Sequence, residues 1–250
     1  KRRLLGRCSG KRKRNRIKKR SHGRAGRKRR KRRESGTGGK ERKYGKERLC
    51  GNSAKNDCFI NWKAGFEIMH IWGHFKTITK HKLMVMKYCF RIGLYRQGLL
   101  HDLSKYSWTE FSVGCKYYQG NRSPNNAERE DTGLSTSWIH HYGRNKHHFE
   151  HWVDYGINCD TIIQGVPMPR KYIAEMVMDR ICASKVYNPG TYTDKAPLAY
   201  FMKSKEKLWF VHKQTNEHLE FLLRMLAEKG EKETLYYIRN VYLKGKEIKN

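Results

Sequence analysis

Apolar residues recur at helical spacing along most of the chain that follows residue 56. Between Trp62 and Phe90 they return every three or four positions, and Gly93 supplies a stop, which predicts one long helix or two in succession. No stretch alternates apolar and polar residues as a half-buried strand does. The pattern predicts an all-α domain with further helices over residues 97–103, 107–118, 135–155, 170–186, 204–229 and 231–244.

Polar motifs mark the expected ends of the middle helices. Ser107 and Glu110 have the spacing of a capping box, and either Ser135 or Ser137 can cap the helix that starts there. Residues 120–133 are rich in Asn, Pro, Asp and Gly, so we expect them to form a loop.

Residues 1–56 differ in composition from the rest of the chain. The first 50 residues hold 25 Lys and Arg against 3 acids, a net charge of +22 out of +32. They contain too few large apolar residues to repay the entropy of ordering, so we expect a disordered basic tail ahead of one domain over residues 57–250. Such charge neutralises several phosphates at once, which makes nucleic acid the expected partner of the tail. A solvated tail with adventitious affinity for polyanions is the alternative.

Cysteine content and hydropathy bear on the compartment. The seven cysteines are scattered without a Cys-x-x-Cys pair, which fits a reducing cytoplasm better than a disulfide framework or a zinc ribbon. No run approaches the roughly 18 apolar residues of a membrane span, and no apolar signal segment follows the basic start. We expect a cytoplasmic protein without a membrane partner, and the sequence does not indicate its oligomeric state.

Histidines gather on the predicted helices at spacings that suit metal ligands. His70, His74 and His81 lie within about 40° of one another at 100° per residue, so one helix face could present all three. A solvated face with one buried histidine is the alternative. The adjacent pair His101 and Asp102 adds an imidazole nitrogen and a carboxylate oxygen, which suit a hard or borderline divalent cation.

A second histidine-rich segment, WIHHYGRNKHHFEHW, offers two faces about 100° apart if it is one helix. The two faces carry, respectively, His140, His147 and His151, and His141, Asn145, His148 and Trp152. We favour the second face, because an amide and an indole beside two histidines suit a positioned site, but the helix phase leaves the choice open. Farther along, Glu175 and Asp179 share a face of a largely apolar helix, where an acid needs a charged partner such as a metal or Arg180.

The order of His81, the His101-Asp102 pair, a histidine pair and Asp179 resembles the HD-domain superfamily of metal-dependent phosphohydrolases. A closer resemblance, between about residues 70 and 200, is to a bacterial and phage family of unknown function. The stretches that carry it are HFKTITKHKLMV, GLLHDLSKYSWTEF, GRNKHHFEHW and YIAEMVMDR. The superfamily resemblance implies a single HD-like helical bundle that binds a divalent metal ion, whereas the family brings no established activity.

The resemblance also implies the roles of individual residues. The expected ligands of one ion (Mn, Fe, Co, Ni, Zn or Mg) are His81 or the alternative His74, together with His101, Asp102 and Asp179. Asp102 could bridge to a second ion held by His147 or His148, and His141 is a further candidate ligand. The metal held at Asp102 would activate a water molecule to attack the phosphorus atom of the substrate. Lys105 and Arg144 would neutralise phosphate oxygens.

These expectations favour a phosphohydrolase that acts on a nucleotide or another phosphorylated small molecule. The alternative is a nucleic-acid-binding protein that uses residues 1–56, with the helical domain as a catalytically silent scaffold.

Overall fold

The computed structural model describes residues 53–156 and 162–246, with side chains from residue 70 onward. The expectations for residues 1–52 lie outside these ranges. The elements follow one another as α1 (Ser53–Arg91), α2 (Tyr95–Leu100), η1 (Leu103–Tyr106), α3 (Trp108–Lys116), α4 (Pro124–Thr132), α5 (Thr136–Arg144), η2 (Phe149–His151), β1 (Val153–Tyr155), β2 (Ile163–Gly165), α6 (Arg170–Tyr187), α7 (Ala196–Lys205), α8 (Lys213–Asn240) and η3 (Tyr242–Lys244). The predicted all-α class is confirmed, because the only strands among the described residues form one small antiparallel pair.

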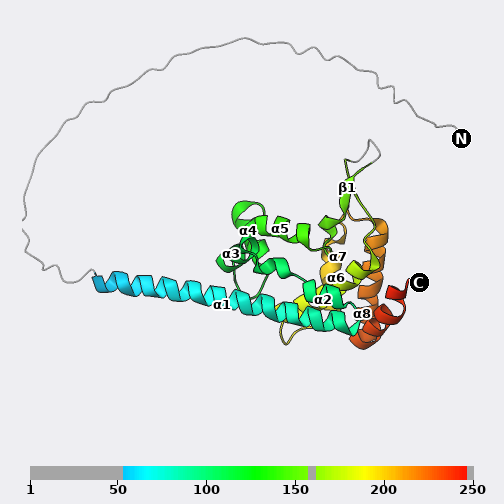
Figure 1. The fold of residues 1–250 in the computed structure, drawn as a ribbon, viewed down its shortest axis with the longest axis horizontal. Helices are drawn as coiled ribbons and strands as arrows, with labels where there is room; N and C mark the ends of the chain where they lie inside the picture. The colour runs from blue at the N-terminus through cyan, green and yellow to red at the C-terminus, as the bar shows by residue number, and fades with distance from the viewer. Residues whose placement is uncertain (1–52, 157–161, 247–250) are drawn as a thin grey trace, which may run out of the picture. The chain divides into compact units, whose positions relative to one another are not determined.

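Helix α1 is a single helix of 39 residues and already includes residues 53–56, ahead of the expected domain start. It ends where the sequence predicts, because Gly93 adopts a left-handed φ of 84° and the Leu94 N–H donates to the Cys89 carbonyl at 2.8 Å. The ending turns the chain back, so that α2 packs against the C-terminal half of α1 (Figure 1).

Helices α1, α6 and α8 surround the main apolar core, and α7 closes it from one side (Figure 1). The core side chains that are 0% exposed include Val85, Ile173, Val177, Ile181, Phe201, Leu219, Leu222, Leu226 and Ile238. Because this core holds α1 against α6, it fixes the relative positions of two predicted metal ligands, His81 on α1 and Asp179 on α6.

Two predictions for the middle of the chain are wrong. Residues 120–133 are not a loop, because Pro124 begins α4 and Gly133, with φ 82°, follows its end. The Pro and Gly in this stretch therefore mark the two ends of a helix. The helix predicted to reach residue 155 ends at Arg144, because the backbone of Asn145 is extended.

The C-terminal helices also differ from the expected ranges. Helix α7 ends at Lys205, where a helix was expected to begin, and the next helix begins only at Lys213. Gly230 has φ 79° and ψ 174°, which places a kink at the boundary that the sequence suggests. None of the helices in the described ranges combines the length and the apolarity that a membrane span requires.

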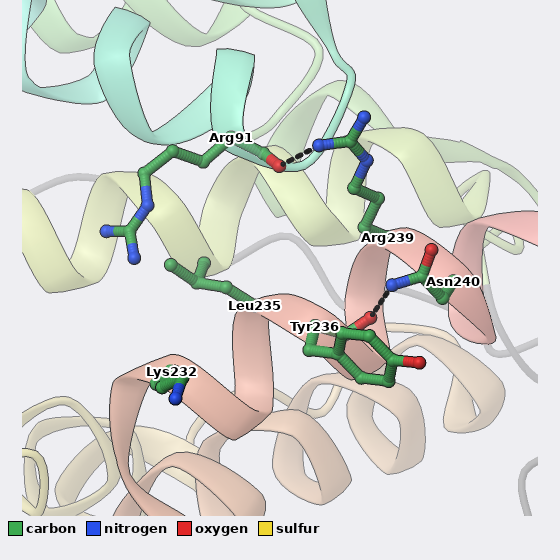
Figure 2. Close-up of a pocket in the computed structure, with 6 residues that line it drawn as sticks. All are labelled: Arg91, Lys232, Leu235, Tyr236, Arg239 and Asn240. Carbon is green, nitrogen blue, oxygen red and sulfur yellow. Dashed lines mark hydrogen bonds between the residues drawn. The ribbon is translucent and has the colours of Figure 1, made fainter.

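An open cavity of about 490 Å³ lies between the end of α1 and the C-terminal part of α8 (Figure 2). Its lining consists of Arg91, Lys232, Leu235, Tyr236, Arg239 and Asn240. Arg239 donates to the carbonyl of Arg91 at 3.2 Å, which ties the two helices together (Figure 2). No predicted site residue is part of this lining, so the candidate chemistry lies elsewhere.

Candidate metal centre

Seven of the predicted ligands meet in two adjoining groups. We call His81, His101, Asp102 and Asp179 the first cluster, and Asp102, His141, His147 and His148 the second cluster. Within each cluster, one donor atom per residue lies within 4.8 Å of all the others. Asp102 belongs to both, so its carboxylate lies between two potential ion positions.

The backbone at Asp102 is held in an unusual conformation. Asp102 has φ 53° and ψ 23°, and no other residue except glycine has a positive φ in the described ranges. Aspartate tolerates this region better than most residues, although at some energetic cost. The Lys82 ammonium donates to the carbonyls of Leu99 and His101 at 2.8 Å each, so it satisfies the end of α2 just before Asp102. Lys82 thus fixes the turn that directs the carboxylate inward.

The first cluster joins α1, the end of α2 and α6. The His81 Nε2 atom lies 2.9 Å from Asp179 Oδ1, and the His101 Nε2 atom lies 3.6 Å from the same oxygen. The His101 Nε2 atom is also 3.4 Å from Asp102 Oδ2. Two imidazole nitrogens and two carboxylates therefore face a common point.

The second cluster is built by α5 and the turn that follows it. The Nε2 atoms of His141 and His147 lie 3.3 Å and 3.5 Å from Asp102 Oδ1, the carboxylate oxygen that does not face His101. The His148 Nε2 atom is buried among these groups and has no hydrogen-bond partner. Asn145 places the turn, because its amide donates to the His141 carbonyl and to Ser104 Oγ, both at 2.8 Å.

The buried polar atoms of the clusters fit a metal. Ten buried side-chain N and O atoms lack a hydrogen-bond partner in the described residues, and six of them belong to His81, His101, Asp102, His147 and His148. Unpaired buried polar atoms are costly, so such a concentration points to a ligand. Metal–ligand bonds of about 2.0–2.2 Å put donor atoms roughly 3–4 Å apart, and histidine nitrogens lie 2.9–3.7 Å from the aspartate oxygens of their clusters. The donor set of imidazole and carboxylate suits Mn, Fe, Co, Ni or Zn.

Two buried glutamates contact the Nδ1 atoms of the cluster histidines, on the side of each ring opposite Nε2. Glu175 Oε1 lies 3.0 Å from His101 Nδ1 and 3.3 Å from His147 Nδ1. Glu110 Oε2 lies 2.8 Å from His141 Nδ1, and its other oxygen lies 2.6 Å from His140 Nδ1. A carboxylate that accepts from Nδ1–H leaves the Nε2 lone pair free for a metal, as at many metal sites.

The charges of the site favour ionised acids. Burial alone would raise the pKa of Asp102, but the neighbouring charges of His101 and Lys105 hold that pKa well below its usual range. Burial likewise opposes ionisation of Asp179, and the nearby imidazoles of His101 and His81 hold its pKa well below normal. Burial, followed by the charges of His147 and His141, keeps the pKa of His148 well below 6.5. Carboxylates and a neutral imidazole are the protonation states that bind metals.

Lys105 is the predicted catalytic cation that does reach the clusters. Its ammonium lies 2.6 Å from Asp102 Oδ2, and its side chain is 28% exposed. Asp179 is 19% exposed, whereas the side chains of His81, His101, Asp102, His141 and His147 are each at most 7% exposed. Solvent therefore reaches the clusters past Lys105 and Asp179.

The structure places two predicted residues outside the clusters. His74 is buried against Phe111 and Tyr118, and burial, with a smaller effect of the Lys105 charge, lowers its pKa to about 4. Arg144 is exposed on α5 and donates to the His140 carbonyl at 3.4 Å. Of the two alternative first ligands, His81 lies in the first cluster and His74 does not.

Sequence reasoning gave Glu110 another role. The predicted capping box is wrong, because the Ser107 side chain makes no capping bond and the Glu110 carboxylate faces the histidines of α5. The sequence indicated Glu175 only as an acid one helical turn before Asp179, without a role at the histidines. An acid among apolar neighbours was the available signal for both.

Comparison with known protein families agrees with the motifs. The model of a family of unknown function, DUF5662, matches residues 70–225, well over half of the chain. The chain belongs to DUF5662. This DUF5662 protein matches no curated protein and no solved structure significantly. The matched range contains both clusters and the two glutamates, so the centre is part of the family domain.

Proposed function

We propose that this DUF5662 protein is a metal-dependent phosphohydrolase whose two clusters form an HD-like centre for two divalent ions. The observation that carries the proposal is the set of six unpaired buried donor atoms in clusters that share Asp102. When bound, divalent ions supply Lewis-acid activation of a water molecule and of a phosphoryl oxygen. The substrate proposed is a nucleotide or another small phosphoester.

The chain's own groups have distinct tasks in this proposal. The carboxylate of Asp102 holds the two positions together, because each of its oxygens faces a different cluster. The Lys105 side chain is partly exposed, and its ammonium beside Asp102 can bind a phosphate oxygen and offset the charge that develops there. Arg144 stays a proposed second phosphate contact from its exposed position on α5.

The test is release of p-nitrophenol from p-nitrophenyl phosphate and its diester, and of phosphate from nucleotides, by the full chain loaded with Mn, Fe, Co, Ni, Zn or Mg. The matched variants are Asp102→Asn and Asp154→Asn, which make the same chemical change, and Asp154 is exposed on β1. We expect turnover by the wild type and by Asp154→Asn, and only background from Asp102→Asn. Equal turnover by both variants would refute the proposal.

Binding of nucleic acid through residues 1–56 is a second proposal. Its support is the sequence, in which 25 bases face 3 acids over the first 50 residues. Affinity that falls linearly with the logarithm of salt concentration, and is lost without this segment, is the expected result. We also propose a cytoplasmic location, supported by the free thiols of Cys89, Cys115 and Cys182.

A further inference from the structure

Glu175 is the one acid in the described residues that lies behind a histidine from each cluster. A single oxygen, Oε1, lies within 3.3 Å of the Nδ1 atoms of both His101 and His147. The opposite ring nitrogens of these histidines face Asp102, one toward each carboxylate oxygen. The two imidazoles thus stand side by side between Glu175 and Asp102, with ring centroids 4.4 Å apart.

The pattern of paired and unpaired ring nitrogens distinguishes Glu175 from a metal ligand. His101, His147 and Glu175 could themselves surround an ion on distance alone. However, the unpaired atoms of both histidines are Nε2, on the Asp102 side, whereas neither Nδ1 atom is unpaired. Because Nδ1 is satisfied by the carboxylate, the lone pairs available for metal point away from Glu175.

We propose that Glu175 is a positioning residue shared by both ion positions, which fixes the tautomer and orientation of one histidine ligand in each cluster. The inference rests on the two-ion centre of the proposed function. Glu110 provides a natural comparison, because among the cluster ligands it contacts only His141, in the second cluster. Replacement by glutamine should therefore weaken the binding of both ions at Glu175 and of one ion at Glu110.

The experiment titrates Mn²⁺ into the metal-free full chain and follows free Mn²⁺ by electron paramagnetic resonance and heat by calorimetry. Removal of an outer-shell partner lowers metal affinity by about 10–100-fold. We expect Glu175→Gln to weaken both ions by such a factor, and Glu110→Gln to weaken one. Circular dichroism and thermal unfolding in chelator check that each variant is folded.

If Glu175→Gln does not fold, Glu175→Asp replaces it, because aspartate keeps the charge and withdraws the carboxylate by one methylene. We then expect a smaller loss that is again seen for both ions. A wild type that binds two ions, with a Glu175 variant that weakens one or neither, would overturn the inference and leave the two-ion centre intact. A folded wild type that binds fewer than two ions would overturn the centre itself, whatever the glutamate variants do.

Discussion

Replacing Asp102 by asparagine should remove more metal than the same change at Asp179. Asp102 is the only acid of the second cluster and one of two in the first. Asp102→Asn therefore leaves three histidines without an acid at one position and a single carboxylate at the other, whereas Asp179→Asn leaves the second cluster unchanged. Asparagine also tolerates the left-handed backbone at this position, so the turn can be kept.

The expected losses of metal affinity and of folding stability follow from the contacts of Asp102. An outer-shell partner already contributes up to about 100-fold, so loss of a shared ligand should cost each ion more than about 100-fold, or about 2.8 kcal/mol. In the metal-free protein, the variant also deprives the Lys105 ammonium of its partner at 2.6 Å. Breaking a buried pair costs about 3–5 kcal/mol, and we expect about 2–3 kcal/mol here because the lysine is partly exposed.

The assay is Zn²⁺ titration by calorimetry of the wild type, Asp102→Asn and Asp179→Asn, with urea unfolding of the metal-free forms. We expect weakened binding of two ions in the first variant and of one in the second. Asp102→Asn with two ions bound at wild-type affinity, or equal losses in the two variants, would refute the bridging arrangement.

Three further substitutions test the surroundings of the centre. Gly114→Ala would place a Cβ atom 2.1 Å from His74 Nε2, so we expect a loss of about 1–3 kcal/mol in urea unfolding, and a neutral result would contradict the position of His74. Ser135→Ala removes the side-chain acceptor of the Trp138 N–H at the start of α5 and should cost about 1 kcal/mol, with unchanged stability counting against the cap. Glu231→Gln breaks contacts of Glu231 with Lys185, Tyr88 and Arg91 and should cost about 1–2 kcal/mol at pH 7. Burial would raise the pKa of Glu231, but the hydrogen bond from Lys185 keeps it below its usual value, so the carboxylate stabilises the fold above about pH 4.5 and this contribution fades as the pH falls through the folded-state pKa. A difference in unfolding free energy between wild type and variant that stays constant from pH 7 to pH 3 would contradict this account.

The residues of the first cluster could be named from sequence, although the choice between His74 and His81 stayed open. The apolar period of α1 extends through His81, and the His101-Asp102 pair follows an apolar helix end, so both signals are local. Asp179 lies on a helix whose apolar positions place it toward the core. Helix phase sets the positions of His81 and Asp179, whereas His101 and Asp102 follow the end of α2 directly.

The second cluster could not be predicted in the same way. Helical phase separates His147 from His141 and His148, but α5 ends at Arg144 and the turn that follows brings all three together. That ending depends on a bond between Asn145 and Ser104, which are 41 residues apart, so no local pattern reports it. The role of Glu110 is likewise set by contact with α5, and its spacing from Ser107 favoured a cap instead.

We expect both clusters to bind divalent ions. The most direct measurement is elemental analysis of the folded full chain, purified without chelator and again after chelation and addition of Mn, Ni or Zn. The account predicts two ions per chain in the wild type and their loss in a His101→Ala, Asp102→Ala variant that remains helical. A folded wild type without metal after all three additions would contradict it.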